Sequence, residues 1–281
     1  MCMGFGCNAA GVIGCKIIDS PREKLIAILT NSFVPCNGRF PFLITIATIF
    51  IGSYFGGSLS SLVSTLCVLL VVLLGILLTL IISKLLSKTI LKGMPSSFIL
   101  ELPPYRKPQI GKVLVRSLFD RTLFVLGRAI AIAAPTGLVI WLFANVSFNG
   151  ITLLTHIANF LNPFATLMGL DGYILTAFIL GLPANEIVLP IILMSYLSQG
   201  TLIELDNIFA IGEILKNNGW TIITGINVMI FTLLHFPCST TLLTIKKETN
   251  SWKWSFLAFA LPTACGIILC MITNGIFQIF F

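Results

Sequence analysis

The stretch Gly181-Leu182-Pro183-Ala184-Asn185-Glu186-Ile187-Val188-Leu189-Pro190 decides how the chain is organised. It lies inside the apolar run 173–197 and carries that run's only formal charge, on Glu186. The two prolines break helical hydrogen bonding. A carboxylate in hydrocarbon costs roughly 3 kcal/mol, and non-helical backbone is tolerated there only against protein or a water-filled cavity. We therefore expect Glu186 to face a polar path through a helix bundle. The alternative is a carboxylate satisfied by a neighbouring helix, or a protonated one.

The composition predicts an all-α, polytopic transmembrane helix bundle in a lipid bilayer. Of the 281 residues, 57% are apolar and only 10% are charged, against about 25% in soluble domains. The excess of basic residues fits cytoplasmic loops near anionic lipid and gives no argument for nucleic acid. The eight cysteines form no C-x-x-C pair. No phosphate-binding loop, H-E-x-x-H or G-x-S-x-G motif occurs, so we expect no catalytic residues and no bound nucleotide.

Hydropathy and helix breakers divide the chain further. The segment 1–18 is expected to be a half-helix or a re-entrant piece, followed by an interfacial helix at 21–31 with Ser20 as its N-cap. The basic connection 84–121, with an amphipathic helix at 109–121, should be cytoplasmic. The acidic loop 199–218 then lies outside if 172–198 is re-entrant, or if two crossings start near 150. If 172–198 is instead a simple span, Lys246 lies outside and the C-terminus inside. The other expected elements are spans at 40–57, 59–83, 122–146 and 255–280, an interfacial or re-entrant pair at 150–170, and an apolar run from Trp220 that is interrupted at 235–241.

The two halves of the chain echo each other. Gly4-Phe5-Gly6-Cys7-Asn8 precedes Phe33-Val34-Pro35-Cys36-Asn37, and the stretch quoted above precedes His235-Phe236-Pro237-Cys238-Ser239. Each half therefore has a glycine-broken apolar segment bearing Asn, and then a Pro-Cys break. Paired broken segments of this kind point to a transporter binding site and a possible inverted repeat.

The donors at these breaks suit a first-row divalent cation better than Mg²⁺ or Ca²⁺. The opposing interpretation is that a buried cysteine is a small hydrophobe, which we favour for Cys67, Cys265 and Cys270. A lone histidine beside aromatic residues, such as His235, is more often structural. The predicted metal ligands are Cys7, Cys36, Cys238 and Glu186, and the predicted transport pathway contains Glu186, Asn185, Asn8, Ser239 and Thr240.

These motifs resemble the C-terminal membrane (Gate) region of ferrous iron transport protein B, the FeoB family. Residues 3–8 look like its M-G-F-G-C-N gate motif, and 31–41 is similar to its N-P-F-x-x-C-x-A-R-x-P stretch. Residues 100–106, L-E-L-P-P-Y-R, look like the linker between its two Gate modules, and 183–190 and 237–249 resemble its second Gate. Asn185 departs from the lysine that many members carry before the gate glutamate.

The resemblance implies a membrane permease module for Fe²⁺ uptake across the bacterial cytoplasmic membrane. It implies a first Gate module ending at 83, a cytoplasmic linker at 84–121, and a second Gate module with the FeoB C-terminal region at 122–281. The family's N-terminal GTPase domain is missing, so we expect a GTPase half as partner, a possible homo-oligomer, and a chain that is a fragment, a split-gene half or a degenerate copy. The rival functions are a permease for nucleosides or other small solutes, and a non-transporting membrane subunit or remnant.

Overall fold

The computed structural model describes residues 2–54, 58–89, 111, 115, 124–148, 150–198, 200–202, 205 and 207–280. These residues are nearly all helical, which confirms the predicted all-α membrane bundle; one short antiparallel hairpin joins β1 (Ser147–Phe148) to β2 (Ile151–Thr152). The helices are α1 (Asn8–Gly14), α2 (Pro21–Thr30), α3 (Phe40–Phe50), α4 (Ser58–Lys88), α6 (Phe124–Asn145), α7 (Leu153–Leu167), α8 (Gly172–Leu180), α9 (Val188–Tyr196), α10 (Ile208–Asn217), α11 (Ile222–Leu234), α12 (Ser239–Thr249) and α13 (Trp252–Phe280).

Three helical stretches in the described residues are long and apolar enough to cross a membrane: 59–88, 222–249 and 252–279. The helices α7 and α8 pass the same test together but are bent by 110° at their junction. The span expected at 40–57 is shorter than predicted, because α3 ends at Phe50 before the glycine at 52. The region 199–218 is not simply a loop, since it contains α10. The L-E-L-P-P-Y-R linker lies outside the described residues, as does the predicted helix at 109–121 except for residues 111 and 115.

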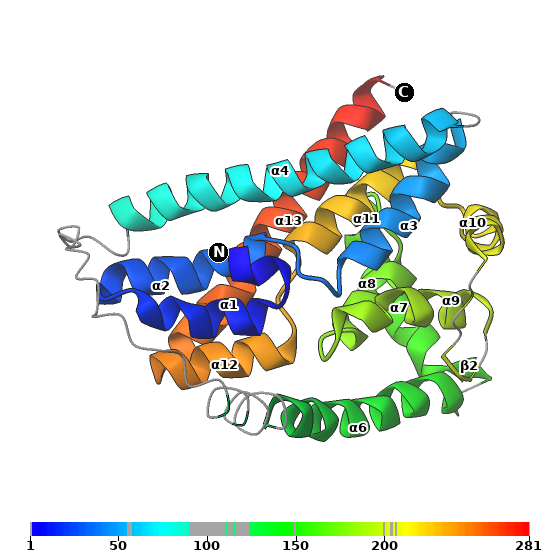
Figure 1. The fold of residues 1–281 in the computed structure, drawn as a ribbon. Helices are drawn as coiled ribbons and strands as arrows, with labels where there is room; N and C mark the ends of the chain where they lie inside the picture. The colour runs from blue at the N-terminus through cyan, green and yellow to red at the C-terminus, as the bar shows by residue number, and fades with distance from the viewer. Residues whose placement is uncertain are drawn as a thin grey trace.

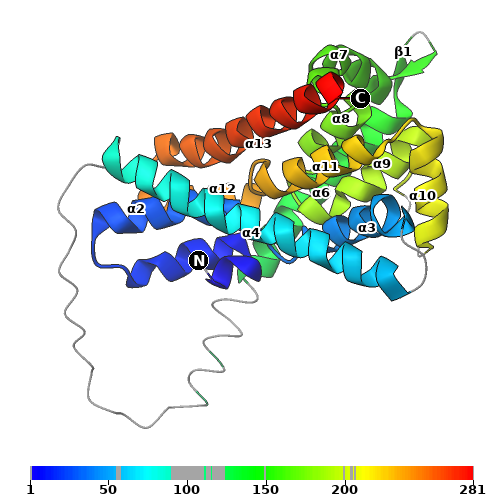
Figure 2. The ribbon, with the colours of Figure 1, turned by 90° about the horizontal axis from the view of Figure 1, so that it is seen from above.

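One span, 222–249, and one pair of shorter helices, α2 and α3, are each broken near the middle of the bundle. The helices α2 and α3 are separated by residues 31–39, and α11 and α12 by residues 235–238. Figures 1 and 2 both place α1, α2 and α12 together on one side of the molecule and α3, α9 and α10 on the other. The long helices α4 and α13 cover these broken segments, since α4 packs on α2, α3 and α11 while α13 packs on α11 and α12. Figure 1 shows α6 on the opposite side of the bundle from α4.

The segment 171–196 is a helical hairpin formed by α8 and α9. The Tyr196 hydroxyl at the end of α9 donates to the Asp171 carboxylate at the start of α8, and Trp220 Nε1 donates to the Tyr196 hydroxyl at 2.7 Å. The two ends of the hairpin therefore lie together beside the start of α11. Its tip lies beside the end of α11, where the Ser239 N–H donates to the Leu182 carbonyl at 2.8 Å. The chain thus enters and leaves on one side, which agrees with the re-entrant alternative for 172–198.

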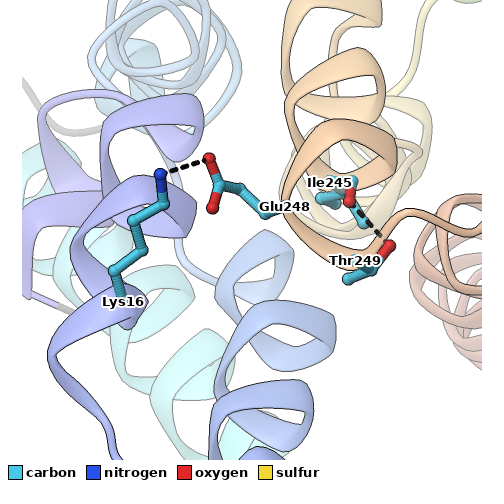
Figure 3. Close-up of polar contacts among 4 residues, drawn as sticks. All are labelled: Lys16, Ile245, Glu248 and Thr249. Atoms are coloured by element: carbon cyan, nitrogen blue, oxygen red, sulfur yellow. Dashed lines mark hydrogen bonds and ion pairs between the residues drawn. The ribbon is translucent and has the colours of Figure 1, made fainter.

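The basic residues of three distant segments gather at the other end of the bundle, here called the basic end: residues 15–24, 84–88 and 246–253. Arg22 of α2 donates to the Ser87 carbonyl of α4 at 3.2 Å. Lys16 Nζ lies 3.0 Å from Glu248 Oε1 of α12, as Figure 3 shows. In the same turn, Thr249 Oγ1 donates to the Ile245 carbonyl at 2.7 Å. The turn that follows α1 is therefore joined to α12 at the basic end.

Reversing one charge of the Lys16–Glu248 pair should destabilise this junction. The Lys16 side chain is 57% exposed but that of Glu248 is only 8% exposed, so Lys16→Glu leaves two carboxylates facing each other. We expect a loss of about 1 kcal/mol in the free energy of unfolding, the upper range for a partly exposed pair. The double variant Lys16→Glu/Glu248→Lys should recover most of it. Thermal unfolding in detergent is the measurement, with Lys253→Glu on α13 as control; failure of the double variant to recover would argue against the pair.

Candidate functional site

Four backbone breaks meet at the centre of the bundle: residues 5–8, 31–39, 181–187 and 235–238. In the first half, the Asn37 N–H donates to the Gly6 carbonyl at 3.2 Å; in the second, the Ser239 N–H donates to the Leu182 carbonyl. In both halves the residue after Pro-Cys therefore bonds to the glycine-containing turn. From these turns α1 runs to the basic end and α9 runs to the opposite end, so the two halves are arranged with opposite orientation. Broken helices related in this way surround the substrate sites of many transporters.

Arg39 joins the two halves at this centre. Its side chain is fully buried and donates to the carbonyls of Leu233 at 2.7 Å, His235 at 3.0 Å and Phe236 at 3.1 Å. Its guanidinium thereby satisfies the carbonyls that the end of α11 leaves without helical partners. Sequence reasoning missed this residue. The signal was present, because Arg39 is the only charged residue between Lys24 and Lys84.

Asn185 is a second junction between the halves. Its side chain is buried, with Oδ1 3.2 Å from His235 Nε2 and Nδ2 3.9 Å from the Cys36 sulfur. The other nitrogen of His235, Nδ1, lies 2.9 Å from the Thr232 carbonyl. Its ring also packs against Phe178, with centroids 4.9 Å apart. Both nitrogens of His235 are therefore occupied within the protein, which agrees with the structural interpretation of that residue.

Glu186 follows Asn185 and is exposed in a cavity between the halves. The cavity has a volume of about 250 Å³, and its wall includes Gly38, Pro41 and Thr45 of the first half and Pro190 of the second. A Cβ atom at Gly38 would lie 3.9 Å from Glu186 Oε2, so the carboxylate faces the break that contains Cys36. Among the residues that the structure describes, Glu186 forms no ion pair. The carboxylate is therefore available to a ligand.

The three predicted cysteine ligands all lie at the central breaks but are buried to different degrees. Cys7 is exposed, Cys36 is buried and Cys238 is intermediate. The Cys238 sulfur lies 3.2 Å from Thr241 Oγ1. Within the described parts of the chain, no group of three or more His, Cys, Asp or Glu side chains is arranged to hold a metal ion. The donors are therefore brought to one region without forming a closed coordination sphere.

The remaining pathway candidates also lie at the breaks. Asn8, at the start of α1, and Ser239, at the start of α12, each have a buried side-chain oxygen that bonds to no other described residue. Thr240 is half-buried beside Ser239. By contrast, Cys270 is buried in α13, where its thiol donates to the Asn227 carbonyl at 3.4 Å. That placement agrees with a packing role for Cys270.

Comparison with known proteins supports the resemblance seen in the sequence. Residues 68–120 match the family model described as the C terminus of ferrous iron transport protein B, and residues 126–252 match the Gate model, described as nucleoside recognition. The whole chain aligns at 31% identity over 287 residues with an Fe(2+) transporter FeoB of Staphylococcus aureus strain COL, and at 27% over 296 residues with one of Methanocaldococcus jannaschii.

A third relative is a fusion of Fe(2+) transport protein A with FeoB from Porphyromonas gingivalis, 22% identical over 94% of this chain. No solved structure matches. The chain spans 40% of the length of the S. aureus protein, 41% of the M. jannaschii protein and 35% of the fusion protein. The chain is thus a relative of the FeoB proteins and corresponds to their C-terminal membrane part.

Proposed function

We propose that this chain is the membrane permease module of an Fe²⁺ uptake system. The observation that carries the proposal is the meeting of four backbone breaks around Glu186, with three thiols at the same breaks. Glu186 is an exposed carboxylate that has no ion-pair partner among the described residues. Carboxylate and sulfur together suit a borderline divalent cation. The similarity to Fe(2+) transporters supports the same cargo.

In this proposal Fe²⁺ is a passing substrate and the site changes shape as it passes. Glu186 supplies the charge that attracts the ion into the cavity, and Cys7, Cys36 and Cys238 replace water as ligands at the centre. Asn185, Asn8, Ser239 and Thr240 supply neutral oxygens along the path. Because the thiols come from breaks in both halves, a small relative movement of the halves would assemble or separate the ligands. An incomplete coordination sphere is consistent with an ion that must also leave.

The partner, location and domains follow from the same proposal. A GTPase half supplied by another part of the transporter would drive or gate the module, which itself binds no nucleotide, and homo-oligomers are possible. The module would lie in the bacterial cytoplasmic membrane with its basic end inside. The first Gate module would end at 83 and the second would begin at 122, with a cytoplasmic linker between them.

The test of this function is uptake of labelled Fe²⁺ by cells that lack other iron importers. The cells would express this chain, a candidate GTPase half, or both. We expect uptake well above background only when both are present at matched membrane abundance. If the GTPase half alone gives the same uptake as both parts together, this chain conducts nothing, and the non-transporting remnant is favoured.

A second candidate function is a permease for nucleosides or another small solute, favoured by the nucleoside-recognition description of the matched Gate model. Metal dependence separates the two, since thiols at three breaks have no use in nucleoside binding. Uptake of labelled nucleoside that is indifferent to Fe²⁺ and to chelators would support this second candidate.

The purified chain alone should not hydrolyse GTP or ATP. No G-x-x-x-x-G-K-[ST] stretch is present in the sequence to hold the phosphates. Phosphate release would be measured with the chain in detergent and in lipid. A rate that persists through two orthogonal purification steps and copurifies with the chain would contradict this prediction.

A further inference from the structure

Two buried amide oxygens beside the start of α1 have no hydrogen-bond partner in the part of the chain that the structure describes. They are Oδ1 of Asn8, which is 2% exposed, and Oδ1 of Asn31, which is 1% exposed. Leaving a buried acceptor unsatisfied is costly. The two oxygens therefore point to a ligand that brings positive charge or donors.

The two oxygens lie against the same glycine. A Cβ atom at Gly4 would come within 2.6 Å of Asn31 Oδ1 and 3.4 Å of Asn8 Oδ1. A Cβ atom at Gly11 would also come within 2.6 Å of Asn31 Oδ1. Glycine at both positions is what allows the Asn31 amide to fit between the first two turns of the chain.

The orientation of the Asn31 amide is also determined. Its Nδ2 donates to the backbone carbonyl of Asn8 at 3.0 Å. Exchanging the nitrogen and oxygen would place two acceptors against each other, so Oδ1 must face Gly4 and the Asn8 side chain. On the same turn, Gly6 and Cys7 are exposed.

We propose that Asn8 and Asn31 bind a partly dehydrated alkali cation, Na⁺ or K⁺. Amide oxygens are hard ligands and do not select sulfur-seeking metals. The oxygens are neutral, so they do not supply the charge that a divalent ion needs. Neutral oxygens at unwound helix ends coordinate monovalent ions in transporters and channels. Asn8 also belongs to the proposed Fe²⁺ path, but the alkali site uses neither the thiols nor the carboxylate of that path and does not depend on them.

The test is thermal unfolding of the purified full-length chain in NaCl, KCl and N-methylglucamine chloride at equal ionic strength, without Fe²⁺ and without a GTPase half. The wild-type midpoint should rise saturably with Na⁺ or K⁺ relative to N-methylglucamine. Asn8→Ala and Asn31→Ala should weaken the apparent alkali affinity at least about tenfold. Gly4→Ala should do the same while keeping both ligands, because its Cβ atom intrudes on the oxygens.

Asn227→Ala is the matched control. Asn227 is as buried, but its Nδ2 donates to the Met168 carbonyl at 2.9 Å and its Oδ1 accepts from the Thr273 hydroxyl. This variant should unfold earlier in all three salts and keep the alkali-dependent rise. Equal wild-type midpoints in the three salts, as a bound water would give, would overturn the proposal. So would a full alkali-dependent rise in both Asn31→Ala and Gly4→Ala.

Discussion

Replacing Glu186 by glutamine should abolish most Fe²⁺ transport while leaving insertion and abundance unchanged. Glutamine keeps the size and hydrogen-bonding capacity of the side chain but removes its charge, and the Coulomb attraction is the main term for a cation in a site of low dielectric. The exposed position of Glu186 in its cavity, with no ion pair among the described residues, means that little stability depends on the charge. Uptake of labelled Fe²⁺ at matched expression, with the GTPase half present, is the measurement.

Two companion variants make this result specific. Glu186→Asp should keep part of the activity, since the charge survives and only its reach is shorter. Glu213→Gln removes an exposed carboxylate from α10 and should transport like the wild type. Wild-type uptake by Glu186→Gln would remove this residue from the pathway.

Replacing Arg39 by glutamine should produce the largest loss of stability in the chain. The guanidinium is fully buried and bonds to three carbonyls of the segment 233–236. Removing it leaves these acceptors without partners inside the protein, so we expect a loss of about 3 kcal/mol or more in the free energy of unfolding. Thermal unfolding in detergent and membrane abundance would both report it.

Arg39→Lys should rescue only a small part of this stability, because a single ammonium group cannot reproduce the geometry of the guanidinium fork. Arg22→Gln is the control: this half-exposed arginine bonds to Ser87 at the basic end, and its loss should cost much less. An Arg39→Gln variant as stable as Arg22→Gln would mean that Arg39 does not join the two halves.

The sequence predicted the breaks themselves well, because their causes are local. Pro183 and Pro237 lie in the breaks, as expected of a residue that cannot continue helical hydrogen bonding. The expectation of a break at Pro190 was wrong, since this residue lies in the first turn of α9, where its missing N–H removes no helical bond. The Ser20 cap is confirmed, since its hydroxyl accepts the Glu23 N–H of α2. Glu186 stood out for the same kind of reason, as a single charge in an apolar run.

The sequence could not predict which groups the breaks would bring together. Arg39 bonds to a carbonyl 194 residues away, and no local pattern contains that information. Asn31 was overlooked because its role depends on Gly4 and Gly11, which lie in an earlier segment of the chain. The helix α10 was predicted as part of a loop because its flanks are polar and acidic, although Ile211 and Leu215 pack into the core.

The most direct test of the central claim is whether Fe²⁺ protects the thiols at the breaks. The purified chain would be alkylated under anaerobic conditions with and without Fe²⁺, and each cysteine followed by mass spectrometry. Cys7 and Cys238 should react several-fold more slowly with Fe²⁺ present, and Glu186→Gln should lose this protection. Cys265 is partly exposed, like Cys238, but lies on α13. It should react at the same rate with and without Fe²⁺. Equal rates for Cys7 and Cys238 with and without Fe²⁺ would contradict a metal path through the four breaks.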